Sequence, residues 1–146
     1  MDYYKAFNEI LAGATEIALA TSAGNIPNVR IVSICNDESR PGVVYFQSKG
    51  KSRKVDEFAQ NSAVAFTTCP FAAATGGSKI TNIRCNSAVV VKSKHSFMEL
   101  AELFCAKVPE YREIYMANAD VLEVFELHVK EALVVVDYGN YGFVTF

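Results

Sequence analysis

The chain has 146 residues, of which 51% are hydrophobic and 21% are charged, and its formal net charge is -2. This length fits a single domain spanning residues 1–146, and the composition is that of an ordinary globular protein. The near-neutral charge argues against nucleic-acid binding, because nucleic-acid-binding domains are usually strongly basic. No apolar run approaches the roughly 20 residues of a membrane span, and the first residues do not resemble a signal peptide. We therefore expect a cytoplasmic protein that makes no membrane contact.

The cysteines and histidines indicate no metal site. They include no Cys-x-x-Cys pair, which structural zinc sites commonly use. The residues concerned are Cys35, Cys69, Cys85, Cys105, His95 and His128. We expect four free thiols, most of them buried, with Cys69 as the candidate for a redox-active thiol.

The first half of the chain alternates strand-like runs with turns. Apolar residues recur at helical spacing between Tyr3 and Leu11, which predicts a short N-terminal helix. Strands are expected at residues 17–21, 29–35, 43–47 and 63–68, with turns at 23–25 and 36–42 and a short helix at 55–61.

The second half contains one strong local signal. Ser96 and Glu99 form a capping-box pattern, which predicts a helix that ends before Pro109. Glu126 and His128 alternate with apolar residues, which predicts a strand with one solvent-facing polar side. The elements expected are a loop at 69–78, a long strand at 80–93 bent near 86–87, a helical turn at 110–117, strands at 124–129 and 132–137, and a short terminal segment.

The expected elements predict a mainly β fold. Six or seven strands with short connections and few helices are typical of an antiparallel barrel. The strands do not alternate regularly with helices, which argues against a doubly wound parallel sheet.

The segment from Ser48 to Lys54, which we call the basic loop, reads Ser-Lys-Gly-Lys-Ser-Arg-Lys in an otherwise acidic chain. It follows an apolar strand and precedes a helix. Cations are unfavourable at the start of a helix, because that end already carries partial positive charge. Hydroxyls, cations and free backbone N–H groups at a helix start form a phosphate site. A solvated surface turn is the simpler alternative.

The order Gly50-Lys51-Ser52 after an apolar strand invites comparison with the nucleotide-binding P-loop. That motif requires a glycine five positions before the Gly-Lys pair, and Tyr45 occupies this position. The order of the remaining elements is also wrong for that fold. We therefore reject the P-loop interpretation.

Two arginines lie inside apolar strands and have two interpretations. Arg30 and Arg84 are either surface residues or point toward the same anion as the basic loop. The sequence contains no Gly-x-Ser-x-Gly elbow and no evident pair of catalytic carboxylates. If the protein is an enzyme, we expect a cofactor to carry the chemistry, and the sequence indicates no particular catalytic residue.

The ordered set of these segments resembles the FMN-binding split-barrel proteins, the superfamily of pyridoxamine 5'-phosphate oxidase. The resemblance covers nearly the whole chain and is greatest to small members grouped with nitroimidazole-resistance reductases. The matching segments are 17–21, 27–32, 44–48, 52–54, 61–65, 82–86 and the helix beginning at Ser96.

This resemblance implies an antiparallel split barrel that forms a homodimer, with FMN between the subunits. Arg53 and Lys54 would hold the FMN phosphate. Ser48, Lys49 and Ser52 would lie nearby. The remaining implied contacts are Arg30, Ile31 and Val32 along the ribityl chain and flavin ring, Phe46 and Gln47 against the cofactor, and Asn82 and Arg84 from the partner subunit.

The chain also departs from pyridoxamine 5'-phosphate oxidase itself. That enzyme carries a C-terminal segment with Trp and Arg, whereas this chain has no Trp and its last arginine is Arg112. This difference argues against vitamin B6 oxidation. The resemblance thus implies an FMN-dependent oxidoreductase acting on an unidentified small molecule. The alternatives are a nitroimidazole reductase, a non-catalytic flavin-binding stress protein, and a barrel that binds haem or a deazaflavin.

Overall fold

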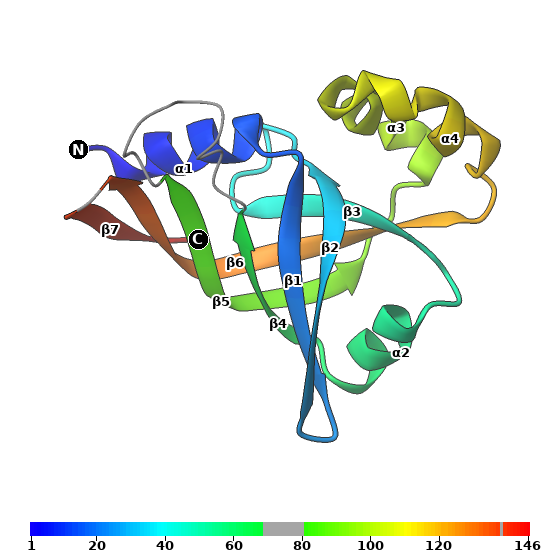
Figure 1. Cartoon of the computed structure of the whole chain (residues 1–146), viewed down its shortest axis with the longest axis horizontal. Coiled ribbons are helices and arrows are strands. Elements are labelled where there is room, and N and C mark those ends of the chain that lie inside the picture. Colours follow the sequence, from blue (N-terminus) through cyan, green and yellow to red (C-terminus); the bar gives the residue numbers. More distant parts are fainter. Residues whose placement is uncertain (69–80, 138) are drawn as a thin grey trace.

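The computed structural model describes residues 1–68, 81–137 and 139–146. Within these residues the strands are β1 (Glu16–Ala23), β2 (Ile26–Cys35), β3 (Val43–Lys49), β4 (Ala63–Thr68), β5 (Asn82–Lys92), β6 (Leu122–Asp137) and β7 (Asn140–Thr145). They form one antiparallel sheet in the order β3-β2-β1-β4-β5-β6-β7. Pairing of β3 with β6 closes six strands into a barrel, and β7 extends the sheet beyond it (Figure 1). The predicted mainly β antiparallel split barrel is confirmed.

The helices in the described residues lie at the ends and sides of the barrel (Figure 1). They are α1 (Tyr3–Gly13), α2 (Arg53–Gln60), α3 (Phe97–Lys107), the 3-10 turn η1 (Pro109–Tyr111) and α4 (Arg112–Ala117). The predicted capping box of α3 is present, since the Ser96 hydroxyl accepts from the Glu99 amide and the Glu99 carboxylate accepts from the Ser96 amide. This reciprocal pair satisfies two backbone donors that a helix start leaves free.

The hairpin between β1 and β2 explains the register of the first strands. Ala23 faces Ile26, so only Gly24 and Asn25 connect the two strands. Both have positive φ values, 56° and 63°. This conformation is that of a type I′ turn, whose twist matches that of paired strands. The predicted turn at 23–25 is confirmed.

The long strands show one confirmed detail and one correction. The pairing of β5 with β6 is irregular between Arg84 and Ala88, where the sequence predicts a bend. The predicted strands at 124–129 and 132–137 are in fact one strand, β6, of 16 residues. The polar residues at 130–131 do not interrupt it, because they remain exposed while both neighbouring stretches pair with β5.

The core has two parts because β3 is buried on both faces. Phe46 lies inside the barrel, where it stacks against Phe125. Tyr45, on the opposite face of β3, packs in a second cluster with α3 and α4. Because this second layer covers the outer face of β3, residues on both faces of the strand are buried and its apolar run is continuous.

The prediction that the polar side of residues 124–129 faces solvent is wrong for Glu126. Glu126 is buried, and Arg40 makes a bidentate ion pair with it at 3.0 and 3.2 Å. Ser93 Oγ donates to Glu126, and His128 Nε2 lies 2.8 Å from the same carboxylate. Glu126 therefore belongs to an internal network, and His128 is only partly exposed.

The described cysteines are free, buried thiols: Cys35, Cys85 and Cys105. Burial raises the pKa of Cys35 to about 12, so this thiol stays protonated and unreactive at neutral pH. Cys69 and the predicted loop at 69–78 lie outside the described residues. Among the residues that are described, no helix is long and apolar enough to cross a membrane.

Candidate functional site

A cavity of about 480 Å³ opens where β2, β3, α2 and α4 meet. We call it the basic cavity. Its polar side consists of Gln47, Ser48, Lys49, Ser52 and Lys54, all from the end of β3 and the start of α2. These are five of the residues predicted to bind the cofactor, and the fold brings them together. Four residues of the basic loop, Ser48, Lys49, Ser52 and Lys54, therefore line a cavity.

The remaining lining of the basic cavity is mainly apolar. Ile31 and Val32 of β2, both predicted, lie there with Ser33. Four residues that the sequence interpretation missed complete this wall: Ile114, Tyr115, Asn118 and Leu122. A cavity whose lining combines cations and hydroxyls with aliphatic and aromatic groups suits a ligand that joins an anion to an apolar ring.

The start of α2 is open toward a ligand. Ser52 is the N-cap residue, but its side chain makes no capping hydrogen bond to the helix. Its hydroxyl instead lies 3.1 Å from the hydroxyl of Ser48. The first backbone N–H groups of a helix have no partner within the helix, and together with its dipole they favour an anion.

Lys54 is the partly buried cation of this cavity. Burial, followed by the positive charge of Arg30, lowers the pKa of Lys54 below its ordinary value. Both effects disfavour the charged ammonium group in the free protein. The negative charge of an anion in the cavity would oppose both effects by favouring the charged form.

Glu57 of α2 is the central acceptor beside the cavity. Its side chain is only 7% exposed. It accepts hydrogen bonds from the Thr21 hydroxyl, from Asn28 Nδ2 at 3.2 Å, from Arg30 Nη2 at 3.1 Å and from Arg53 Nε at 3.1 Å. The Thr21 hydroxyl, and then Arg30 and Arg53, lower the pKa of Glu57. The carboxylate is thus charged at neutral pH and joins β1, β2 and α2.

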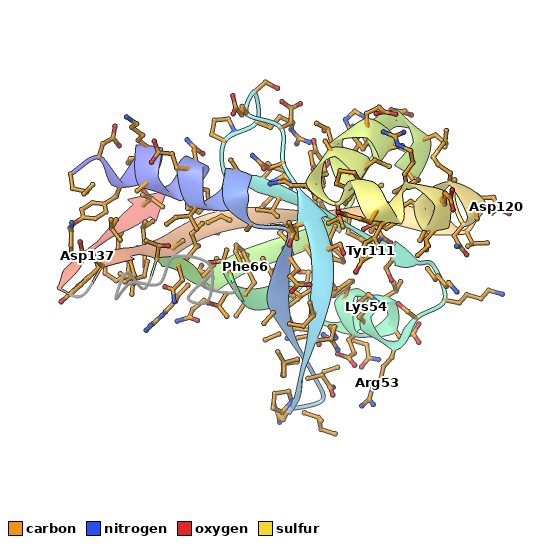
Figure 2. The ribbon with its side chains drawn as sticks, turned by 45° about the horizontal axis from the view of Figure 1, so that its top comes forward. Arg53, Lys54, Phe66, Tyr111, Asp120 and Asp137 are labelled. Atoms are coloured by element: carbon orange, nitrogen blue, oxygen red, sulfur yellow. The ribbon has the colours of Figure 1, made fainter. Side chains whose placement is uncertain are left out.

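The predicted residues Arg30 and Arg53 therefore lie next to the basic cavity and not in its lining. Arg53 extends from the first turn of α2, and its side chain is 76% exposed (Figure 2). Arg30 and Arg53 thus both pair with the single carboxylate of Glu57, and the charge of Arg30 acts on Lys54 as well.

The other predicted site residues lie elsewhere in this chain. Phe46 is fully buried in the barrel, where Phe58 and Phe125 contact it. Asn82 is buried, and its Oδ1 atom has no hydrogen-bond partner among the described residues. Arg84 is exposed and lines a second groove of about 330 Å³.

This second groove lies on the outer face of the sheet. Arg84 and Asn86 form its polar edge, and its floor contains Ala18, Ala20 and Ala65. Val29 lines this groove and is 70% exposed; Ile31, two residues further along β2, lines the basic cavity and is 55% exposed. The two concave regions thus share one exposed apolar strand face.

Comparison with known proteins identifies the family. A model of the pyridoxamine 5'-phosphate oxidase-like family matches residues 10–141. The chain belongs to the pyridoxamine 5'-phosphate oxidase-like family. A search of curated proteins finds no match.

Solved structures share the fold at low sequence identity. A NimC/NimA family protein from Clostridium acetobutylicum is 21% identical with a TM-score of 0.69, over 98% of this chain and 92% of that one. A heme binding protein from Mycobacterium smegmatis is 15% identical with a TM-score of 0.73, over 98% of this chain and 57% of that one. An FAD-binding protein from Mesorhizobium loti is 10% identical with a TM-score of 0.65, over 86% of this chain and 88% of that one. Proteins with this fold are thus described as binding different cofactors, haem in one case and FAD in another.

Proposed function

We propose that this protein binds FMN in the basic cavity and is an FMN-dependent oxidoreductase acting on an unidentified small molecule. The observation that carries the proposal is the make-up of the cavity, whose lining combines Lys49, Lys54 and two serines with aliphatic and aromatic side chains. A phosphate monoester suits the polar residues, and a planar ring suits the apolar ones. The donor set therefore fits FMN.

Individual residues take distinct roles in this proposal. Lys54, Lys49, Ser48 and Ser52 would hold the phosphate, with Arg53 at the rim of the cavity. Ile31, Val32 and Gln47 would lie along the remainder of the cofactor. Bound flavin would supply the electron or hydride transfer, while the protein supplies orientation and electrostatics.

The proposal includes a homodimer with the cofactor at the interface. The exposed apolar face of β2, which carries Val29 and Ile31, supports it, because such a face on a barrel strand gains stability when a second copy covers it. In the dimer, Asn82 and Arg84 of the partner subunit would approach the flavin. A cation such as Arg84 near the ring would favour the reduced, anionic flavin. Replacing Arg84 with Ala should therefore lower the flavin midpoint potential.

Cofactor identity is tested by reconstitution. Purified protein, treated to remove any co-purified ligand, would be titrated with FMN, riboflavin, FAD and haem, and each dissociation constant measured by fluorescence or absorbance. We expect FMN to bind most tightly, because the cavity is lined for a terminal phosphate. Tighter binding of FAD or haem would contradict the assignment of FMN.

Turnover is tested on the FMN-loaded protein. Stopped-flow reduction by a nicotinamide cofactor, followed by reoxidation with a panel of acceptors, should show repeated cycles. Selective reoxidation by a nitroimidazole would identify a nitroimidazole reductase. A flavin that is bound but never turns over would leave a non-catalytic flavin-binding protein and contradict the oxidoreductase proposal.

Dimer formation is tested by substituting the apolar strand face. Val29→Asp should shift the mass measured by light scattering from dimer to monomer and weaken FMN binding. Met98→Asp is the matched control, since Met98 is 55% exposed but lies on α3. A wild-type protein that is monomeric with FMN bound would contradict the interface.

A further inference from the structure

We infer that Glu57 is the positioning residue of the phosphate site, which orients Arg53 so that its two terminal guanidinium nitrogens serve the phosphate. This inference rests on the proposed function and deepens it. Glu57 does not line the basic cavity; it acts through the arginine that it holds.

The geometry of Arg53 supports this role. Its Nε atom donates to Glu57 Oε1 at 3.1 Å. Its Nη1 and Nη2 atoms make no hydrogen bond to the described residues, and the side chain is largely exposed. A guanidinium group has five N–H donors in a fixed plane, so one side can bind a carboxylate while the other remains available for a phosphate.

The environment of Glu57 explains why the pairing fixes Arg53. An ion pair between two exposed side chains is worth little, because both partners remain flexible. Glu57 differs because its carboxylate is buried and receives three other donors, from Thr21, Asn28 and Arg30. Arg53 is therefore attached to an immobile acceptor, and it loses less conformational freedom when phosphate binds.

The negative charge of Glu57 and its positioning of Arg53 have opposite effects on phosphate affinity. A carboxylate close to a phosphate site repels the ligand, so its removal should strengthen phosphate binding if charge alone mattered. If positioning matters more, removal should weaken phosphate binding. The sign of the change therefore separates the two roles.

The test compares FMN with riboflavin, which lacks the phosphate. The ratio of the two dissociation constants isolates the contribution of the phosphate from that of the ring. In Glu57→Gln we expect FMN affinity to fall about tenfold, the size of one charge-assisted hydrogen bond, while riboflavin affinity changes less than about twofold. Equal losses for both ligands would mean that Glu57 is merely structural, and tighter FMN binding would mean that it acts only as a charge. Either result overturns the inference.

Glu123 provides a matched control for charge. Its carboxylate lies against the basic loop at Gly50 and pairs with Lys92 at 3.2 Å, but it does not contact Arg53. Glu123→Gln removes the same charge and should leave the preference for FMN over riboflavin unchanged or slightly increased. If Glu123→Gln reduced the preference for FMN as much as Glu57→Gln does, positioning through Arg53 would be contradicted.

Arg53→Lys provides a second route that does not depend on the stability of the Glu57 variant. It keeps the charge but lacks the Nε donor, so its preference for FMN over riboflavin should fall as in Glu57→Gln. In the double variant, Glu57→Gln should add little to the loss already caused by Arg53→Lys. Fully additive losses would contradict the inference. A wild-type protein that does not prefer FMN to riboflavin would instead contradict the proposed phosphate site itself. Failure of the proposed function can thus be distinguished from failure of the role inferred for Glu57.

Discussion

The hydroxyl oxygens of Ser48 and Ser52 lie 3.1 Å apart, so a hydrogen bond joins the end of β3 to the first residue before α2. This contact closes the basic loop and directs both hydroxyls to one cavity. Ser52 stands at the N-cap position, yet its side chain caps nothing. Ser48 Oγ donates to the Lys49 carbonyl at 3.1 Å, so Ser52 is the donor between the two serines, and a ligand would replace Ser48 as its acceptor.

Ser52→Ala should therefore separate binding from stability. We expect the free energy of unfolding to change by less than about 0.5 kcal/mol, because no capping bond is lost and the Ser48 hydroxyl, which loses Ser52, still donates to the Lys49 carbonyl. Ser96→Ala, which breaks a complete capping box, should cost about 1 kcal/mol. FMN affinity should fall in Ser52→Ala and not in Ser96→Ala. Denaturant unfolding measures the effect on stability, and FMN titration measures the effect on affinity. Loss of stability without loss of FMN affinity in Ser52→Ala would exclude Ser52 from the phosphate site.

Lys54 predicts the pH dependence of cofactor binding. Burial and the charge of Arg30 lower the pKa of Lys54 in the free protein, and a bound phosphate should raise it. Proton linkage then requires FMN affinity to be highest below the lowered pKa and to fall as pH rises through it. Riboflavin titrations at the same pH values provide the baseline, since riboflavin carries no phosphate.

Lys54→Arg tests whether Lys54 causes this pH dependence. An arginine stays protonated across the range, so the alkaline loss of FMN affinity should disappear in this variant. Lys51→Arg is the matched control, because Lys51 belongs to the same loop but does not line the cavity. An unchanged alkaline loss in Lys54→Arg would assign the titration to another group.

The sequence predicted one side of the site better than the other, for a physical reason. Residues 48–54 are contiguous, so their shared chemistry is visible before folding. Ile114 and Asn118 reach the same cavity only because α4 packs over β3 in the second core layer. An exposed aliphatic residue on a short helix carries no signal of that neighbour. Tertiary packing alone completes the apolar wall.

The network around Glu57 was also invisible in the sequence. The spacing of Arg53 and Glu57 allows a pair one helical turn apart, which on a surface helix indicates little. Only the barrel brings Thr21 and Arg30 onto the same carboxylate. In the same way, alternation along β6 placed Glu126 on a polar side, whereas Arg40 and Ser93 bind its buried carboxylate. Periodicity identifies faces, but it does not tell what covers them.

Glu126 should govern acid stability. Burial raises its pKa, but hydrogen bonds from Arg40, Ser93 and His128 outweigh this effect and lower the pKa to about 2. A group with a lowered folded pKa stabilises the fold above its ordinary pKa of 4.5 and loses that contribution as pH falls toward 2. The contribution is about 3 kcal/mol at neutral pH.

Glu126→Gln should therefore lower the free energy of unfolding at neutral pH. The difference in this free energy between the variant and wild type should become smaller as pH falls below 4.5. Urea unfolding at several pH values measures this. Glu102→Gln is the control, because the pair of Glu102 with Arg112 is exposed and should change little. A constant difference between Glu126→Gln and wild type across the acid range would show that packing and not charge dominates.

Gly142 fixes the contact between β7 and α1. A Cβ atom at this position would lie 2.9 Å from Tyr3 Cγ and closer still to two atoms of the ring edge. The ring has little room to move, since it packs on the core and its hydroxyl donates to Asn140 Oδ1 at 2.8 Å. Gly142→Ala should destabilise the protein by about 1–3 kcal/mol, as overpacking typically does.

Gly13→Ala is the control, because nothing lies within 4 Å of a Cβ atom there and alanine favours the helix. Thermal unfolding compares the variants, and a second substitution, Tyr3→Ala, should relieve most of the penalty at Gly142. If Gly142→Ala is as stable as Gly13→Ala, α1 docks on β7 more loosely than this contact requires.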